Sequence, residues 1–327
     1  MTTTTHLRSP AAAVQPRVSV VICTYTDRRW DDVATALASV RAQSRPPVQT
    51  ILVVDHNPAL LERAKVAFPD VLVVPNKERA GLSGGRNTGV SHAAGDVVAF
   101  LDDDARAEPD WLERLAAGYS DPSVLGVGGA AAPVWPGRRP GWLPAEFDWV
   151  VGCSYVGLPT AAASVRNLIG ANMSFRREVF DTVGGFTDGL GRVGTRPLGC
   201  EETELGIRLR QWRANGRLVY EPAAVVHHRI TEDRAAWRYF CSRCFAEGVS
   251  KAIVSRRVGA SDALETERRY VRSVLPRAIV RGLDPRRRHR SAGVARAGAI
   301  VAGLLLAGAG YARGLLAFGA PGQGGRP

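Results

Sequence analysis

Four short runs of apolar, mostly β-branched residues alternate with segments of helical spacing over the first hundred residues of this 327-residue chain. The runs occupy residues 18–23, 50–55, 71–74 and 96–101. Continuous apolar runs, unlike runs in which apolar and polar residues alternate, are typical of strands that are buried on both faces of a parallel sheet. The pattern therefore predicts an α/β fold, in which helices flank a single mixed, mostly parallel sheet.

Polar residues follow these runs at the points where the predicted strands end. Thr24 and Tyr25 follow the first run, Asp55 ends the second, and an acidic triplet at 102–104 follows the fourth. In open α/β sheets, ligands bind beyond the carboxyl ends of the strands. The sequence therefore predicts a ligand site at this edge of the sheet.

The triplet Asp102-Asp103-Asp104 carries the clearest chemical signal. Three successive carboxylates repel one another unless a cation lies among them. Carboxylate oxygens suit hard cations such as Mg²⁺ or Mn²⁺, which commonly bridge a protein to a diphosphate. A solvated acidic turn is the alternative, and it is weakened because Asp55 ends a neighbouring strand. We therefore expect a Mg²⁺ or Mn²⁺ cofactor at this position.

An acidic pair and a histidine pair are the next candidates. Glu201 and Glu202 follow a glycine-rich segment at 184–199 and open a predicted helix, where carboxylates are favoured by the exposed N–H groups. Such a carboxylate can act as a general base, although a helix start with exposed acids has the same pattern. His227 and His228 end a predicted strand, and adjacent strand residues point to opposite faces. At most one of them can complete a metal site.

The glycine-rich segment at 81–89 resembles a phosphate-binding turn in composition only. It has neither the GxGxxG spacing with an acid about 20 residues later nor the GK[ST] of a P-loop. The sequence therefore does not support classical dinucleotide binding or ATPase activity.

The regular alternation ends after residue 105. We expect further helices at 176–183 and 201–212, and short strands at 218–220 and 224–226. The segment at 172–175 is short and apolar. A segment rich in Pro, Gly and Trp at 133–144 is expected to be irregular, and the one at 184–199 to be a mobile loop that closes over the site.

Six segments in order resemble a family 2 glycosyltransferase with the GT-A fold, which is the fold of nucleotide-diphospho-sugar transferases. They are VSVVICTY, ILVVD, GLSGGRNTG, FLDDDA, the EE-x-x-L helix start and VVHH, and they run from about Val18 to His228. Each segment alone is weak, but the ordered set is specific. The resemblance implies a metal-assisted enzyme that transfers a sugar from a nucleotide-diphosphate-sugar donor to a hydroxyl acceptor, with inversion of the anomeric centre.

The resemblance also assigns roles to residues. It implies donor-binding roles for Thr24, Tyr25 and Asp55 at the base and ribose, and for Arg86, Asn87, Asp102 and Asp103. It implies a metal site formed by Asp104, Asp102 and His228. It implies Glu202 as the general base, but the family often has Glu-Asp where this chain has Glu201-Glu202. Which of these two glutamates acts as the base stays open.

The last quarter of the chain is strongly basic. Residues 251–327 hold 15 lysines and arginines against 4 aspartates and glutamates, so they carry +11 of the net charge of +12. An arginine-rich cluster at 286–290 precedes an uncharged stretch at 297–312. This combination favours an anionic membrane surface, with cations on the cytoplasmic side. We expect a lipid-linked or cell-envelope saccharide acceptor.

We therefore divide the chain into a disordered N-terminus at 1–16, a GT-A domain at 17–235 and a basic helical region at 236–327, in which 297–320 is a membrane-associated segment. The N-terminus has no apolar core and does not predict a signal peptide. The odd number of five cysteines favours the reducing cytoplasm, and the single CxxC at 241–244 is more typical of a helix than of a zinc site. We expect a cytoplasmic protein at the inner face of the membrane.

Three other interpretations remain. A nucleotidyltransferase would also bind nucleotide-sugars, but it would normally have a glycine-rich loop with a basic residue after the first strand, where this chain has TYTDRR. A glycosyltransferase-like scaffold or carbohydrate-binding protein without catalysis does not explain the intact acidic residues. Nucleic-acid binding rests only on the basic tail, which lacks interleaved aromatic residues, and we expect no nucleic-acid partner.

Overall fold

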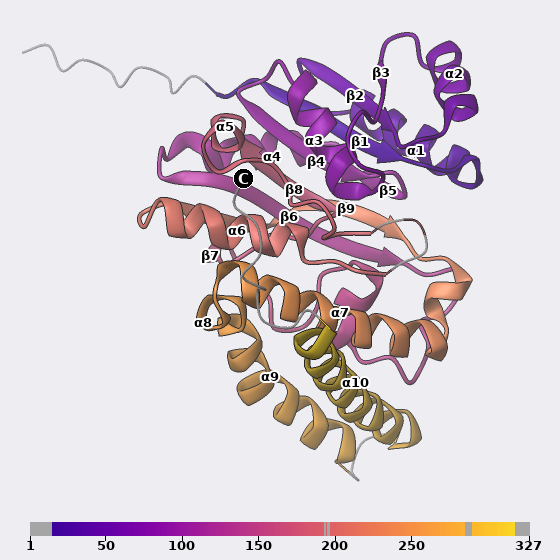
Figure 1. Ribbon diagram of the computed structural model, residues 1–327. Helices are drawn as coiled ribbons and strands as arrows, with labels where there is room; N and C mark the ends of the chain where they lie inside the picture. The colour runs from indigo at the N-terminus through magenta and orange to yellow at the C-terminus, as the bar shows by residue number, and fades with distance from the viewer. Residues whose placement is uncertain (1–14, 193, 195–196, 285–289, 318–327) are drawn as a thin grey trace, which may run out of the picture.

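The computed structural model describes residues 15–192, 194, 197–284 and 290–317, and its centre is one nine-stranded sheet (Figure 1). The strands are ordered β3-β2-β1-β4-β8-β6-β9-β5, and β7 pairs with β9 beside this path. The N-terminal part of the predicted disordered segment, residues 1–14, lies outside the described residues.

The first half of the sheet is parallel, as the apolar runs predict. Its strands and covering helices are β1 (Val18–Thr24), α1 (Trp30–Arg41), β2 (Gln49–Val54), α2 (Pro58–Ala67), β3 (Leu72–Pro75), α3 (Leu82–His92) and β4 (Val97–Asp102). A short 3-10 turn, η1 (Asp27–Arg29), connects β1 to α1.

The second half is mixed. Its elements are β5 (Ala105–Ala107), α4 (Trp111–Ala117), η2 (Gly118–Ser120), β6 (Val124–Val134), η3 (Ala145–Val151), β7 (Ala163–Val165), β8 (Asn172–Arg176), α5 (Glu178–Val183), α6 (Glu201–Trp212), β9 (Arg217–Arg229) and η4 (Glu232–Ala235). Strand β8 runs antiparallel to both β4 and β6, whereas β9 runs parallel to β6.

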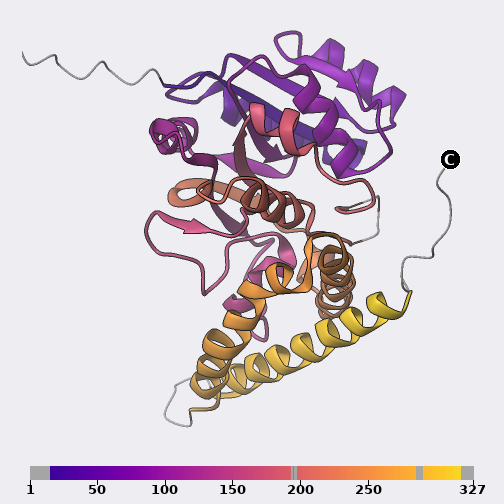
Figure 2. The ribbon, with the colours of Figure 1, turned by 60° about the vertical axis from the view of Figure 1, so that its left-hand side comes forward.

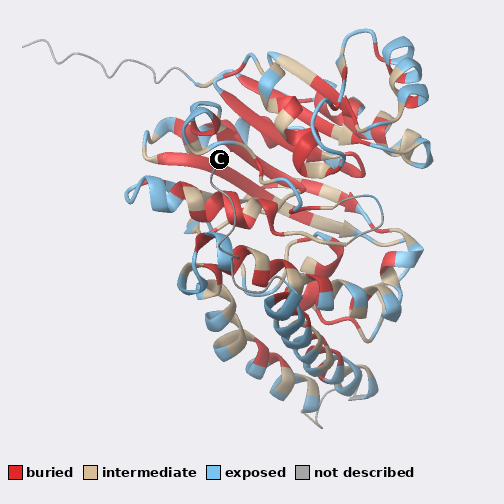
Figure 3. Ribbon diagram, in the orientation of Figure 1, coloured by how far each residue is buried: buried red, intermediate tan, exposed pale blue. Residues whose placement is uncertain are grey.

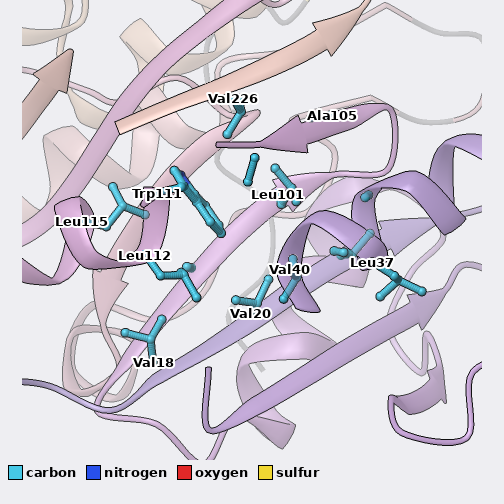
Figure 4. Close-up of a cluster of buried hydrophobic side chains, with 14 of the residues drawn as sticks. Val18, Val20, Leu37, Val40, Leu101, Ala105, Trp111, Leu112, Leu115 and Val226 are labelled. Carbon is cyan, nitrogen blue, oxygen red and sulfur yellow. The ribbon is translucent and has the colours of Figure 1, made fainter. Parts of the chain in front are cut away.

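Both faces of the sheet are buried, which explains why the strands are continuously apolar. Val20 and Ile22 of β1 pack in one apolar cluster with α1, α2 and α4, and the intervening Val21 packs in a second cluster with α5 and α6. Figure 3 shows the buried strands as a continuous band, and Figure 4 shows the first cluster around Trp111. The indole Nε1 of Trp111 donates to Oδ1 of Asn172 at 2.7 Å, so the one polar atom of this buried ring is paired.

Four helices follow the sheet: α7 (Trp237–Val258), α8 (Ala260–Ala263), α9 (Glu265–Leu283) and α10 (Arg290–Ala317). In both views α9 and α10 lie at the end of the molecule opposite α1 to α3 (Figures 1 and 2). Glycines let α7 and α10 approach closely, because a Cβ on Gly248 would lie 2.0 Å from the carbonyl oxygen of Ala307 and one on Gly310 would lie 2.0 Å from that of Phe245.

Two predictions about the second half were wrong. The strands expected at 218–220 and 224–226 form one strand, β9, which continues past Pro222 through a register shift opposite Gly129 and Ala130. Strand β6 was missed, because its glycines and alanines have low strand propensity. A Cβ on Gly129 would lie 1.8 Å from the carbonyl oxygen of Ala224, so close strand contact requires this composition.

The expected fold class is confirmed: one mixed sheet flanked by helices, with a helical C-terminal region. The cysteines of the CxxC motif both lie on α7, where Cys244 is buried in an apolar cluster and Cys241 packs against that cluster. The arginine-rich cluster lies largely outside the described residues, since 285–289 are not described.

Candidate active site

The topology of the sheet brings the acidic triplet to the end of β9. After β4 ends at Asp102, the chain turns sharply and begins β5 at Ala105, which pairs antiparallel with His228. The amide of Arg229 donates to the carbonyl oxygen of Asp104 at 2.9 Å. Residues more than 120 positions apart in the sequence therefore lie side by side.

Asp102, Asp104 and His228 form a group that can hold a metal ion. One ligand atom from each side chain lies within 4.8 Å of those of the other two. Nε2 of His228 is 3.1 Å from Oδ1 of Asp104 and 3.8 Å from Oδ2 of Asp102. Two carboxylates and one imidazole fit Mn²⁺ well, and Mg²⁺ would have to accept a nitrogen ligand. His227 points the other way and pairs with Glu108, in agreement with the expectation that at most one histidine faces the site.

Two arginines lie against the same carboxylates. Nη1 of Arg29 is 2.6 Å from Oδ1 of Asp103 and 3.1 Å from Oδ2 of Asp104, and Nη1 of Arg234 is 3.3 Å from the latter oxygen. Both line the central cavity, next to the predicted place of the diphosphate. The sequence analysis missed both arginines, and no local pattern distinguishes them from the other arginines of the chain.

The pKa values of Asp103 and Asp104 shift in opposite directions. Burial raises the pKa of Asp103 to about 6, and the charge of Arg29 only partly offsets it. Burial also opposes ionisation of Asp104, but His228, Arg29 and Arg234 outweigh it, so the pKa of Asp104 lies below its usual range. Burial lowers the pKa of His228, yet Asp104 raises it well above the usual value. Asp104 thus favours the protonated imidazole, and a cation at this site would take the place of that proton.

Arg86 joins the metal group to the acidic pair. Its guanidinium is buried and donates from Nη1 to Oε1 of Glu201 at 2.7 Å, and from Nη2 to the carbonyl oxygen of Gly170 at 2.9 Å. The same Nη2 lies 3.3 Å from Oδ1 of Asp102. One cation of α3 thus ties the end of β4 to the start of α6.

The two glutamates differ sharply in their surroundings. Glu201 is buried and forms an ion pair with Arg86, so its negative charge is already balanced within the protein. Glu202 is half-buried, lines the cavity and has no ion-pair partner within 4 Å among the described residues. Burial, reinforced by the charge of Glu201, raises the pKa of Glu202 to about 7. A carboxylate with these properties is suited to accept a proton at neutral pH.

The residues expected near a nucleotide lie at the other side of the triplet. Thr24 is buried, Tyr25 is half-exposed, and both line the cavity with Asp55. The carboxylate of Asp55 accepts from Nδ2 of Asn76 at 2.6 Å and from the amide of Gly81 at 2.9 Å. These bonds fix the carboxylate at the end of β2 while leaving it accessible from the cavity.

Asn87 is placed differently from the other predicted site residues. Its Nδ2 donates to the carbonyl oxygen of Phe186 at 2.9 Å, and its Oδ1 accepts from the amide of Phe186 at 2.7 Å. It is not among the described residues that line the cavity. In this geometry both polar atoms of the Asn87 side chain bind the main chain of Phe186 and hold the glycine-rich segment after α5 in place.

A single cavity of about 540 Å³ contains all the other predicted residues. Its lining includes the three metal-binding candidates, both glutamates and Arg86. It also includes residues of α7, α9 and α10, which the sequence analysis did not connect with the site. A donor and an acceptor can therefore meet in one enclosed space.

Comparison with known proteins agrees with this arrangement. Residues 19–184 match the family model described as "Glycosyl transferase family 2". The chain is 38% identical over 242 residues to the glucosyl-dolichyl phosphate glucuronosyltransferase of Haloferax volcanii, covering 73% of this chain and 77% of that one. The chain belongs to glycosyl transferase family 2.

Solved structures show the same fold. A mannosyltransferase from Pyrobaculum calidifontis, in complex with GDP-Man and Mn²⁺, has a TM-score of 0.55 at 16% identity and covers 89% of this chain and 86% of that chain. GalNAc-T7 with UDP, GalNAc and Mn²⁺ has a TM-score of 0.55 at 17% identity and covers 80% of this chain and 58% of that chain. The expected GT-A fold and glycosyltransferase class are therefore confirmed for this family 2 member.

Replacing Arg86 tests how the site of this glycosyltransferase is held together. Arg86→Met should lower the free energy of unfolding by about 3–5 kcal/mol, because it leaves the buried carboxylate of Glu201 without a counter-charge. The double variant Arg86→Met/Glu201→Gln should recover part of this loss. Urea unfolding of the three proteins measures both effects. A loss below about 1 kcal/mol in Arg86→Met would contradict the bridging role, because it is the size of an exposed ion pair.

Proposed function

We propose that this enzyme transfers a sugar from a nucleotide-diphosphate-sugar to a hydroxyl of a lipid-linked saccharide, with inversion and with the help of Mn²⁺ or Mg²⁺. The observation that carries the proposal is the shared cavity, in which Asp102, Asp104 and His228 lie with a half-buried Glu202 that has no ion-pair partner among the described residues. One solved structure of the same fold holds GDP-Man and Mn²⁺, another holds UDP, GalNAc and Mn²⁺, and a 38% identical relative is named for a glucosyl-dolichyl phosphate substrate.

The donor would be held between the parallel strands and the triplet. Asp55, Thr24 and Tyr25 are placed to contact the base and ribose, because they lie beyond the ends of β1 and β2. Asp102, Asp104 and His228 would hold the cation, which supplies charge neutralisation for the departing diphosphate. Arg29 and Arg234 would add positive charge at the same place by exchanging a carboxylate partner for a phosphate oxygen.

Glu202 is the group we assign as general base. It would accept the proton of the acceptor hydroxyl while that oxygen attacks the anomeric carbon and the nucleotide diphosphate leaves from the opposite side. Displacement in one step inverts the anomeric centre. Glu201 would position the base, because its pairing with Arg86 fixes the first turn of α6.

The metal assignment predicts a specific binding defect. Asp104→Asn should weaken Mn²⁺-dependent binding of the preferred nucleoside diphosphate by about 100-fold or more, because it removes a charged ligand. Calorimetry with UDP, GDP, TDP and ADP, each with and without Mn²⁺, measures this effect and identifies the nucleotide. Asp110→Asn is the matched control, since the Asp110 side chain is partly exposed, lies outside the lining of the cavity and, among the described residues, pairs with Arg114. Equal binding by the two variants would contradict the assignment.

The base assignment predicts a defect of the opposite kind. Glu202→Gln should reduce the transfer rate by about 10²–10⁴-fold and leave metal-dependent nucleotide binding intact. The kcat/KM of the unaltered enzyme should rise with pH and level off above about 7, because the base acts only when deprotonated and the pKa of Glu202 is raised to about 7. Rate measurements from pH 5.5 to 9 test both statements. A full rate in Glu202→Gln would overturn the assignment.

We further propose that the enzyme works at the inner face of a membrane. Among the described residues, one helix is long and apolar enough to cross a membrane, by length and composition only, at 291–317 on α10. Its outward side chains include Leu305 and Leu316, which are 68% and 78% exposed. The basic character of residues 251–327 suits the anionic lipids of the cytoplasmic leaflet.

Sedimentation with vesicles tests the membrane proposal. The full chain should sediment with vesicles that contain anionic phosphatidylglycerol, and the variant Leu305→Asp/Leu316→Asp should bind them about tenfold more weakly, because apolar area no longer enters the bilayer. Val66→Asp is the control, since Val66 is 84% exposed on α2 at the opposite end of the molecule. The proposal fails if the full chain stays in solution or if the double variant binds like the control.

A further inference from the structure

The cavity extends beyond the site of sugar transfer. From Glu202 it continues past α7 to a space between η3, α9 and α10. Helices α7, α9 and α10 follow the part of the chain that matches the family model, whereas η3 lies within that part. The residues proposed to bind the donor and the metal ion do not lie in this second part of the cavity.

The far part of the cavity has apolar walls. Phe147 of η3, Val271 and Leu275 of α9, and Leu304 and Ala307 of α10 line it. The described side chains of these walls are apolar, and a nucleotide or a free sugar would gain little from them. An apolar chain would gain about 25 cal/mol for each Å² of its surface that it buried there.

Charged side chains line the boundary between the two parts. Lys251 of α7 lies 2.7 Å from Glu267 and 3.5 Å from Glu247, Arg166 lies 2.5 Å from Glu267, and Arg243 lies 3.2 Å from Glu247. Three cations therefore share two carboxylates, and Lys251 and Arg166 are both buried. A surplus positive charge in a buried place favours an anionic ligand.

We propose that this second part of the cavity binds the lipid phosphate of the acceptor, with the phosphate near Lys251 and Arg243 and the aliphatic chain between α9 and α10. The inference rests on the proposed function, because it names the acceptor class of the same site. The charged boundary suits the phosphate, the walls beyond it suit the chain, and Glu202 lies on the side where the attached sugar would be. The apolar outer face of α10 places this part of the cavity next to the proposed membrane surface.

Gly308 keeps the apolar part open. It lines the cavity on α10, and a Cβ at this position would meet no other heavy atom within 4 Å. Gly298 on the same helix is also exposed and equally open, but it is not among the described cavity-lining residues. The two glycines are a matched pair, because leucine has a higher helix propensity than glycine and favours the helix at both positions.

Binding of farnesyl phosphate to the full chain tests the inference. Calorimetry should show binding of farnesyl phosphate and much weaker binding of inorganic phosphate. Gly308→Leu should weaken farnesyl phosphate binding by about tenfold or more, because the new side chain fills space that the chain must occupy. Gly298→Leu should bind as the unaltered protein does. Equal affinity of these two variants, or equal affinity for inorganic phosphate and farnesyl phosphate, would overturn the inference.

A second pair of variants covers the case in which Gly308→Leu does not fold. Leu304 lines the cavity, whereas its neighbour Leu305 points outward and is 68% exposed. Leu304→Asp should lose farnesyl phosphate binding, and Leu305→Asp should keep it. Similar losses in both variants would also overturn the inference.

The test separates this inference from the proposed function. Metal-dependent nucleotide binding is measured on the same samples and should be unchanged in all four variants. If the unaltered protein binds nucleotide with Mn²⁺ but not farnesyl phosphate, the acceptor inference fails and the transfer function stands. If it binds no nucleotide with Mn²⁺, the proposed function fails, whatever the result with farnesyl phosphate.

Discussion

The buried guanidinium of Arg86 is the interaction on which the rest of the site depends. A charge in the protein interior costs several kcal/mol unless partners surround it, and this one has Glu201, Asp102 and the carbonyl oxygen of Gly170. Those partners come from separate segments of the chain. Because none of them can move without leaving a buried charge unpaired, the end of β4 and the start of α6 are held at a fixed separation.

That fixed separation has a chemical consequence. Asp102 belongs to the candidate metal group, and Glu201 immediately precedes the candidate base. With Glu201 occupied by Arg86, its negative charge stays next to Glu202 and, after burial, is the second cause of the raised pKa of Glu202. The ion pair between Arg86 and Glu201 thus helps to keep Glu202 basic enough to accept a proton at neutral pH.

The sequence predicted the parts of the molecule that local patterns encode. The runs that became β1, β2 and β4 are mostly apolar because both faces of the sheet are covered, and the acidic triplet begins at the end of β4, where ligands bind in such sheets. The start of α6 at Glu201 was also expected from the acidic pair after the glycine-rich segment.

The parts that the sequence did not predict depend on contacts between distant residues. Strand β6 forms because its glycines admit the neighbouring strands, and its own residues have little strand propensity. Asn87 lies in a motif expected to bind the donor, yet its side-chain amide forms two hydrogen bonds with the main chain of Phe186. Arg29 and Arg234 join the site from segments with no distinguishing pattern, and only the pairing of β5 with β9 brings Asp104 close to His228.

The same distinction separates the two ends of the cavity. The donor end is built from strand ends and from a triplet whose chemistry a single sequence displays, and it lies in the part that family members share. The proposed acceptor end is built mainly from three helices whose apolar and basic residues have an ordinary composition for surface helices. Its proposed role can be inferred only from the three-dimensional structure, in which α7, α9 and α10 line a charged boundary and an apolar space next to Glu202. Under the proposed assignment, a change in these helices would alter the acceptor site and leave the donor site as it is.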